Sequence, residues 1–196
     1  MRKIGSIGYG NTPLIRGNSG RFRDFGYQNT SLSFPEKLTN KSLGTAPSDA
    51  IVLFDGGNLD NWGQVVPDDE NSVYFPQWRV EAGAMTIVPE TGHLRTLDTY
   101  GDCQLHLEWA APAEITGDSQ QRGDSGVLMM GLYEIQILDS FDNRTFADGQ
   151  AGAIYGQHPP QVNASRRSGQ WQTFDIVFEA PRFAGDKLEK PAFMTP

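Results

Sequence analysis

Apolar and polar side chains alternate along several short stretches of this chain, and this period of two constrains the fold more than any other feature. The clearest cases are Leu105, Leu107 and Trp109 in one stretch and Phe174, Ile176 and Phe178 in another. Such alternation is typical of β-strands, whose successive side chains point to opposite faces. No stretch repeats apolar residues at helical spacing with capping residues at both ends. The pattern therefore predicts an all-β fold, an antiparallel β-sandwich.

Turn signals separate these stretches. The apolar run at residues 51–54 stops at an Asp-Gly-Gly turn, and residues 78–80 and 85–88 predict a hairpin with its turn at residues 81–84. We expect residues 50–196 to form one domain, a length sufficient for a substantial core.

Residues 1–49 differ from the rest of the chain. They are rich in Gly, Asn, Ser and Arg, and their apolar residues keep neither a helical nor a strand period. We interpret them as an N-terminal extended arm, either ordered along the domain or disordered. An ordered arm offers a route to self-association with a second chain.

Composition excludes several functions. The net charge of −8 and the lack of a basic cluster argue against a nucleic-acid partner. Cys103 is the single cysteine, so the chain forms no internal disulfide, and we interpret it as a half-buried packing residue. The three histidines lack zinc-ligand spacing. No apolar stretch is long enough to span a bilayer, and no secretory signal is visible.

Residues 123–157 carry the most chemistry. Glu134 and Gln136 alternate with the apolar Tyr133, Ile135 and Ile137, so one strand face presents a carboxylate and an amide. From periodicity alone, the plainer interpretation is a solvated polar strand face. An acidic loop follows, and then a glycine-rich segment that contains Tyr155. Carboxylates, amides and aromatic rings on one sheet face suit a sugar-binding surface.

Seven motifs occur in one order between residues 51 and 190. They are LFDGGNLDNW (53–62), WRVEAG (78–83), GDCQLHLEW (101–109), GDSGV (123–127), YEIQILD (133–139), GAIYGQ (152–157) and WQTFDIVF (171–178). Together they resemble the 3-keto-disaccharide hydrolase family. The resemblance implies a concanavalin-like jelly roll with a concave sugar-binding face, and a periplasmic or extracellular location.

Two features depart from the family pattern. Met130 stands where many members have arginine, so a polar sugar contact is expected to be missing. The chain also ends at Pro196, where the family continues through further strands that close the sandwich. We expect the C-terminal closing strands to be absent from this chain or replaced by another segment, such as the arm.

The resemblance also implies a site. Glu134 and Asp139 are the candidate catalytic residues, although Asp139 alternatively caps a turn. The candidate sugar contacts are Gln136, Tyr155, Gln157 and Trp171. We expect no cofactor. Asp142, Asn143 and Asp148 lack EF-hand spacing, so an acidic loop is favoured over a structural calcium site. Of the tryptophans, Trp62 and Trp171 are expected to be the more exposed.

The implied activity is cleavage of a disaccharide or oligosaccharide whose 3-hydroxyl has been oxidised to a ketone. A C3 carbonyl acidifies the C2 hydrogen, so one general base can remove it and expel the aglycone, with water adding afterwards. The sequence leaves elimination and direct hydrolysis open. It also leaves open a non-catalytic sugar-binding domain and a structural subunit that uses the arm, because one fold hosts many functions.

Overall fold

The computed structural model describes residues 6–7, 14–16, 21–24, 46–66 and 69–196. Strands dominate this part of the chain, and its helices are two single turns of 3-10 helix, η1 (Ser119–Gln121) and η2 (Ala147–Gly149). Two large antiparallel sheets enclose a common core, and a separate two-stranded hairpin lies outside them. The predicted all-β sandwich is confirmed, and its finer assignment as a concanavalin-like jelly roll stays a prediction.

The first sheet has six strands. Their spatial order is β12 (Tyr133–Ile137), β11 (Ser125–Met129), β1 (Ser6–Ile7), β9 (His93–Thr96), β5 (Trp62–Val66) and β6 (Asp69–Tyr74). The β11–β12 hairpin pairs Gly126 with Gln136 and Leu128 with Glu134. Facing residues of paired strands point to the same side of a sheet, so this register sets which side chains meet on its outer face.

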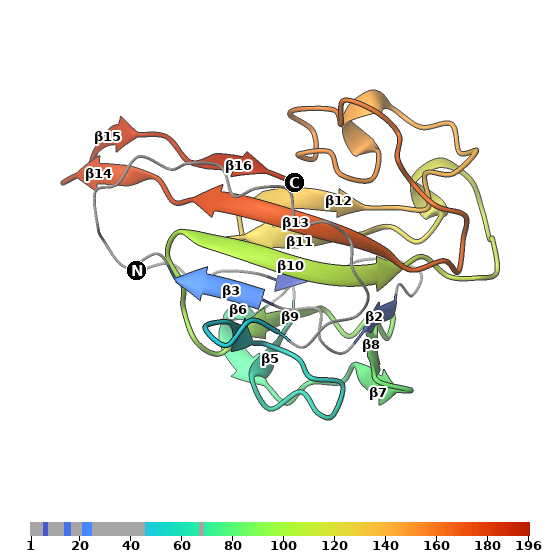
Figure 1. The fold of residues 1–196 in the computed structure, drawn as a ribbon, viewed down its shortest axis with the longest axis horizontal. Coiled ribbons are helices and arrows are strands. Elements are labelled where there is room, and N and C mark those ends of the chain that lie inside the picture. Colours follow the sequence, from blue (N-terminus) through green and yellow to red (C-terminus); the bar gives the residue numbers. More distant parts are fainter. Residues whose placement is uncertain (1–5, 8–13, 17–20, 25–45, 67–68) are drawn as a thin grey trace.

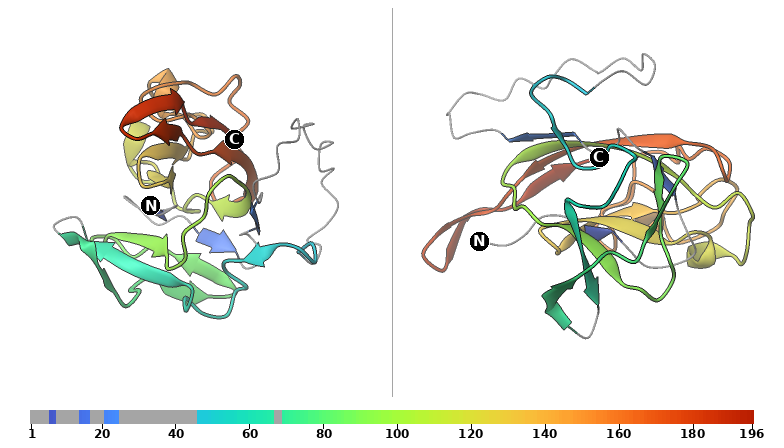
Figure 2. Two further views of the ribbon diagram at one scale, coloured as in Figure 1. Left: turned by 90° about the vertical axis from the view of Figure 1, so that its left-hand side faces the viewer. Right: turned by 90° about the horizontal axis from the view of Figure 1, so that it is seen from below.

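The second sheet has eight strands. The main path is β16 (Phe193–Thr195), β13 (Gln172–Glu179), β10 (Cys103–Ala110), β2 (Leu14–Arg16), β8 (Ala84–Thr86) and β7 (Arg79–Glu81), and β3 (Arg21–Asp24) pairs with β10 and with β4 (Ile51–Val52). Figure 1 shows β10 and β13 crossing the front of the molecule with β11 and β12 in the layer behind. The hairpin of β14 (Arg182–Ala184) and β15 (Lys187–Lys190) extends beyond the sandwich in Figure 1 and in the right-hand view of Figure 2.

The core lies between the inner faces of the two sheets. Ile135, Ile137, Ile176 and Phe178 are almost fully buried, as the alternation predicted. Tyr133 and Phe174, which the same pattern predicted to be buried, are only partly buried and pack against the margin of the core. Each still packs at a tilt against a buried ring: Phe174 against Trp109 at 5.2 Å and Tyr133 against Phe178 at 6.2 Å between ring centroids.

The predicted hairpin at residues 78–88 is confirmed as β7 and β8, joined through Ala82 and Gly83. Both turn residues have positive φ, 50° and 75°, the conformation that tight hairpin turns favour. Cys103 is completely buried rather than half-buried. It occupies the first position of β10, on the core side of that strand.

Three pieces of the predicted arm are strands within the sandwich. β1 lies between β11 and β9, and β2 lies between β10 and β8. The remaining residues of the arm, up to residue 45, lie outside the described residues. Self-association through the arm stays a prediction.

Candidate functional site

The outer face of the β11–β12 hairpin carries a cluster of polar residues. Glu134 and Gln136 lie on this face because Ile135, between them, points into the core. Asp124 immediately precedes β11 and lies two residues before Gly126. It therefore shares the outer face with Gly126, while Ser125 and Val127 point into the sandwich. The structure therefore confirms the prediction that Glu134 and Gln136 lie on the strand face opposite the apolar residues.

A segment after η2 extends the hairpin edge and brings Tyr155 to the same face. The amide of Tyr155 donates to the carbonyl of Glu134 at 2.9 Å, and the amide of Gln136 donates to the carbonyl of Ala153 at 2.9 Å. Ile135 and Ile154 form the β-bridge between these two bonds. Tyr155 is thus the cross-strand neighbour of Glu134, and neighbours of this kind share a face.

The side chain of Glu134 lies across the sheet over Gly126. Any β-carbon at Gly126 would fall 1.9 Å from Oε1 of Glu134, so only a glycine leaves the space that this carboxylate occupies. Among the described residues, neither carboxylate oxygen of Glu134 takes part in a hydrogen bond or an ion pair. The acid is therefore half-buried without a compensating partner.

This environment sets the protonation of Glu134. Burial, followed by the nearby charge of Asp124, raises the pKa of Glu134 to about 7 from its ordinary value of 4.5. Burial also raises the pKa of Asp124, and the hydrogen bond from Gln136 partly offsets that rise. A carboxyl group that titrates near neutral pH can both accept and return a proton, which is the requirement for general acid–base catalysis.

A chain of amides fixes Asp124 and the loops above it. Nε2 of Gln136 donates to Oδ1 of Asp124 and to Oε1 of Gln120, both at 2.9 Å. Nε2 of Gln120 donates in turn to Oγ1 of Thr145 at 2.7 Å and to the carbonyl of Gly149 at 2.9 Å. Gln136 itself is completely buried. Its amide group supports Asp124, and its role as a sugar contact stays a prediction.

Tyr155 lies at the exposed edge of the polar cluster. Its side chain is 39% exposed. Burial and then the charges of Asp124, Glu134 and Asp148 raise the pKa of the Tyr155 phenol, so it keeps its proton at neutral pH and remains a hydrogen-bond donor. Tyr155 therefore offers a neutral donor beside a carboxyl that titrates near neutral pH.

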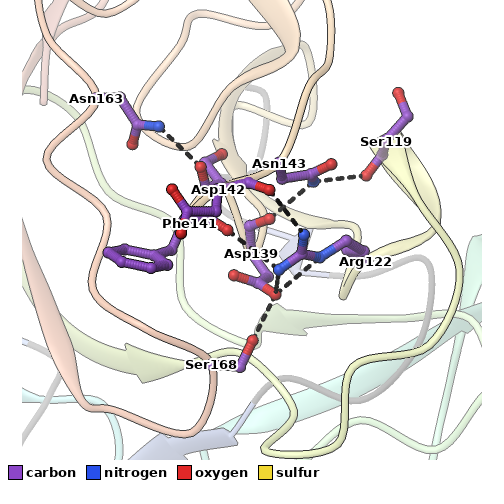
Figure 3. A network of polar contacts seen from close by, with 9 residues as sticks. Ser119, Arg122, Asp139, Phe141, Asp142, Asn143, Asn163 and Ser168 are labelled. Carbon is purple, nitrogen blue, oxygen red and sulfur yellow. Dashed lines mark hydrogen bonds and ion pairs between the residues drawn. The ribbon is translucent and has the colours of Figure 1, made fainter.

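Asp139, the second predicted catalytic residue, lies in a different network (Figure 3). Its Oδ2 accepts from Nε of Arg122 at 3.0 Å and from the terminal nitrogen Nη2 at 2.5 Å, and it also accepts from the hydroxyl of Ser168. Nη2 of Arg122 also donates to the carbonyl of Phe141 at 3.1 Å. Asp139 is 3% exposed. These contacts are typical of a buried ion pair that joins three loops, and the catalytic role of Asp139 stays a prediction.

The two networks meet at η1. The carbonyl of Ser119 accepts from Nδ2 of Asn143 at 2.9 Å, and the same amide group donates to the carbonyl of Asp139 at 2.8 Å. Gln120, the next residue of η1, belongs to the amide chain under Asp124. Asn143 thus uses its amide group to join backbone segments. Among the described residues, no group of three or more His, Cys, Asp or Glu side chains is arranged to hold a metal ion.

The other residues predicted to contact the sugar differ in their exposure to solvent. Gln157 is exposed in the loop that follows Tyr155, and Trp171 is partly buried. The expectation that Trp62 is exposed is wrong: it is 6% exposed, packs in the core, and donates through Nε1 to the carbonyl of Leu53 at 2.8 Å. Met130 lies in the β11–β12 turn with φ of 56° and packs against the core.

Sequence reasoning missed Asp124, Gly126 and Gln120. The alternation that continues from Val127 back to Asp124 was a usable signal, because it places Asp124 and Gly126 on the face of Glu134 once the hairpin register is known. Gln120 had no such signal, since it comes from a single 3-10 turn.

The fold and the site thus define a β-sandwich domain with a cluster of acids, amides and a tyrosine on one outer face. The family model described as a 3-keto-alpha-glucoside-1,2-lyase-like domain matches residues 49–185. The chain belongs to this family. The match contains Asp124, Glu134, Gln136 and Tyr155.

A solved structure supports the same class. This chain is similar to the crystal structure of a putative glycosyl hydrolase from Parabacteroides distasonis ATCC 8503, with 40% sequence identity and a TM-score of 0.70. The similarity covers 76% of this chain and 61% of that protein, so this chain spans about three fifths of its length. A comparison with curated proteins finds no match. The family description and the description of the solved structure both refer to glycosides.

Proposed function

We propose that the domain cleaves glycosides whose 3-hydroxyl has been oxidised to a ketone, with Glu134 as the base. The observation that carries the proposal is the half-buried carboxyl of Glu134, which titrates near neutral pH beside the donor hydroxyl of Tyr155. The family to which the chain belongs supports the substrate class.

In the proposed reaction, Glu134 takes the C2 proton of the keto sugar, and the electron pair of that bond becomes the enolate of the C3 ketone. The neutral hydroxyl of Tyr155 donates to the enolate oxygen, which is the stabilisation that such an intermediate requires. The enolate then re-forms its carbonyl while the C1–O bond breaks. The aglycone leaves with a proton returned by Glu134, and water later adds at C1.

Elimination followed by hydration differs from direct hydrolysis in one measurable way. In heavy water, the elimination route replaces the C2 hydrogen of the product by deuterium, whereas direct attack of water at C1 leaves that hydrogen in place. We expect deuterium at C2 when a 3-keto-glucoside is cleaved, above the exchange seen in the free 3-keto sugar without enzyme.

The residue assignment is tested with a chromogenic 3-keto-glucoside and Glu134→Gln. The substitution keeps the shape and removes the base, so we expect turnover to fall about a hundredfold or more. Glu114→Gln is the matched control, because Glu114 is exposed outside the cluster. Equal turnover by wild type and Glu134→Gln would contradict the role of Glu134, and binding without turnover by wild type would instead indicate a sugar-binding domain.

Location and assembly are further proposals. In the described part of the chain, no helix has the length and hydropathy to cross a bilayer. By family resemblance we propose that the domain acts in the periplasm or outside the cell. Because β1, β2 and β3 belong to the sandwich, self-association through residues 1–49 is tested on the whole chain, whose apparent mass in size exclusion should rise with protein concentration.

A further inference from the structure

Two exposed aromatic rings lie together at the edge of the polar cluster. Phe146 is 47% exposed and Tyr155 is 39% exposed. Their ring centroids are 6.0 Å apart with an interplanar angle of 67°, an edge-to-face contact. A phenylalanine that is half exposed beside a cluster of carboxylates contributes little to the core, so its position calls for another explanation.

The ring of Phe146 is held firmly for an exposed side chain. A β-carbon at Gly149 would lie 2.2 Å from Cε2 of Phe146, so this ring rests directly on the glycine backbone. The amide of Gly149 also donates to the carbonyl of Phe146 at 3.2 Å. The ring is thus supported from below while its other side remains exposed.

The same amide chain that supports Asp124 fixes the backbone on both sides of Phe146. Gln120 donates to Thr145, the residue before Phe146, and to the carbonyl of Gly149, three residues after it. Gln136 donates to Gln120 from the strand that carries Glu134. The aromatic ring and the candidate base therefore belong to one connected framework, which is the preorganisation that a binding subsite needs.

The chemistry of this surface fits a pyranose ring. A pyranose presents an apolar face of C–H groups and a polar edge of hydroxyls. Phe146 offers an exposed apolar ring, and the neighbouring Asp148 and Tyr155 offer an acceptor and a donor. Phe146 contacts Tyr155, and Tyr155 is the cross-strand neighbour of Glu134, so the exposed ring lies one residue away from the candidate base.

We propose that Phe146 forms a second subsite, on which the aglycone ring of a 3-keto-disaccharide or aryl 3-keto-glucoside stacks. This inference rests on the proposed function, because it takes the oxidised ring to lie at Glu134. It adds a specificity: the domain prefers substrates with a ring as aglycone over substrates with a small alkyl aglycone.

The test compares a 3-keto-disaccharide with methyl 3-keto-glucoside. Loss of one stacking partner is expected to lower kcat/KM of Phe146→Ala for the disaccharide about tenfold, and to leave the methyl glycoside within about twofold of wild type. Phe146→Trp retains a stacking face and should keep the preference. Phe183→Ala is the matched control, because Phe183 is 58% exposed on the distant β14–β15 hairpin.

A second variant guards against misfolding of the first. Gly149→Ala should push the ring of Phe146 from its seat and lower the same preference, while circular dichroism reports an intact fold for both variants. The subsite is overturned if Phe146→Ala changes both substrates equally, or if Phe183→Ala changes the preference as much.

Calorimetric binding separates this inference from the proposed function. In a Glu134→Gln background, Phe146→Ala should weaken binding of the disaccharide and leave that of the methyl glycoside unchanged. If wild type binds with this preference but cleaves neither ligand, the proposed function fails and the subsite stands. If the Glu134→Gln protein binds neither ligand, the subsite is overturned.

Discussion

The carboxylate of Glu134 lies against the backbone of Gly126, and the two residues are matched to one another. A β-carbon at Gly126 would come within 1.9 Å of Oε1 and 2.5 Å of Cγ of Glu134. Gly126 does not have positive φ, so an alanine fits its backbone conformation. The glycine is therefore required by the position of the acid, which a β-carbon there would displace from its place beside Asp124 and Tyr155.

Gly126→Ala tests this relationship. Overpacking at this position should lower the free energy of unfolding by about 1–3 kcal/mol and move the Glu134 carboxylate, with a loss of turnover larger than the loss of folded protein explains. Gly101→Ala is the control, because a β-carbon at Gly101 meets nothing within 4 Å and its φ is not positive. Gly101→Ala should match wild type in both measurements. Full turnover by a folded Gly126→Ala protein would show that the position of the acid is unimportant.

The raised pKa of Glu134 predicts how activity depends on pH. A general base works in its deprotonated form, so kcat/KM for a 3-keto-glucoside should rise with pH through about 7. If Glu134 served only to anchor sugar hydroxyls, the rise through pH 7 would appear in binding and not in the rate of the bound substrate. Single-turnover rates between pH 5 and 9 make the distinction.

The same pKa predicts an effect on stability of the opposite sign to that of an ordinary ion pair. Between 4.5 and about 7 the folded protein holds a proton on Glu134 that the unfolded chain has released. The contribution of Glu134 to the free energy of unfolding is therefore complete below pH 4.5 and decreases as the pH rises through the folded pKa. Above that pKa the protein is less stable by about 3 kcal/mol than it is below pH 4.5.

Urea denaturation of Glu134→Gln checks that prediction. The variant should be more stable than wild type at pH 8 and nearly equal to it at pH 4.5, because glutamine carries no charge at either pH. Glu114→Gln, at an exposed position, should show no such dependence. A pH-independent difference between wild type and Glu134→Gln would mean that the carboxyl titrates normally.

The alternation of side chains predicted which face carries Glu134 and Gln136, because a strand fixes side-chain direction within a few residues. It could not predict that Tyr155 lies opposite Glu134, since that pairing depends on how residues 139–152 return to the strand edge. Tyr155 was expected in the site only from the resemblance and the glycine-rich composition of its loop.

The misplacement of Trp62 has a similar cause. Four consecutive residues of β5 are buried, so this strand has no polar face and shows no alternation. The buried amide of Gln64 is hydrogen-bonded, because its Nε2 donates to the carbonyls of Thr91 and His93, at 2.8 and 3.1 Å. Such tertiary partners are not visible in a sequence pattern.

Asp139 shows the same limit at a strand end. The resemblance placed it in one site with Glu134 and Gln136, but its partner Arg122 comes from a loop 17 residues earlier in the chain. The ion pair between Arg122 and Asp139 is nearly buried, with side chains 11% and 3% exposed. A buried ion pair of this kind predicts a structural role that a direct experiment can separate from catalysis.

Arg122→Met removes the cation and leaves the Asp139 carboxylate buried with the Ser168 hydroxyl as its remaining side-chain partner. Leaving a buried charge unpaired is expected to lower the free energy of unfolding by about 3–5 kcal/mol. Arg79→Met is the control, because Arg79 and Glu81 form an exposed pair at 3.4 Å and exposed pairs contribute less than about 1 kcal/mol.

Asp139→Asn then distinguishes the two roles of Asp139. With a structural role, the variant is less stable in thermal denaturation, yet its turnover per folded molecule stays near that of wild type. A catalytic role predicts instead that turnover falls about a hundredfold at temperatures where the variant remains folded. Arg122→Met is the companion measurement, since it perturbs the same loops and leaves the carboxylate in place. If Arg122→Met keeps its turnover per folded molecule and Asp139→Asn loses it, Asp139 takes part in the chemistry.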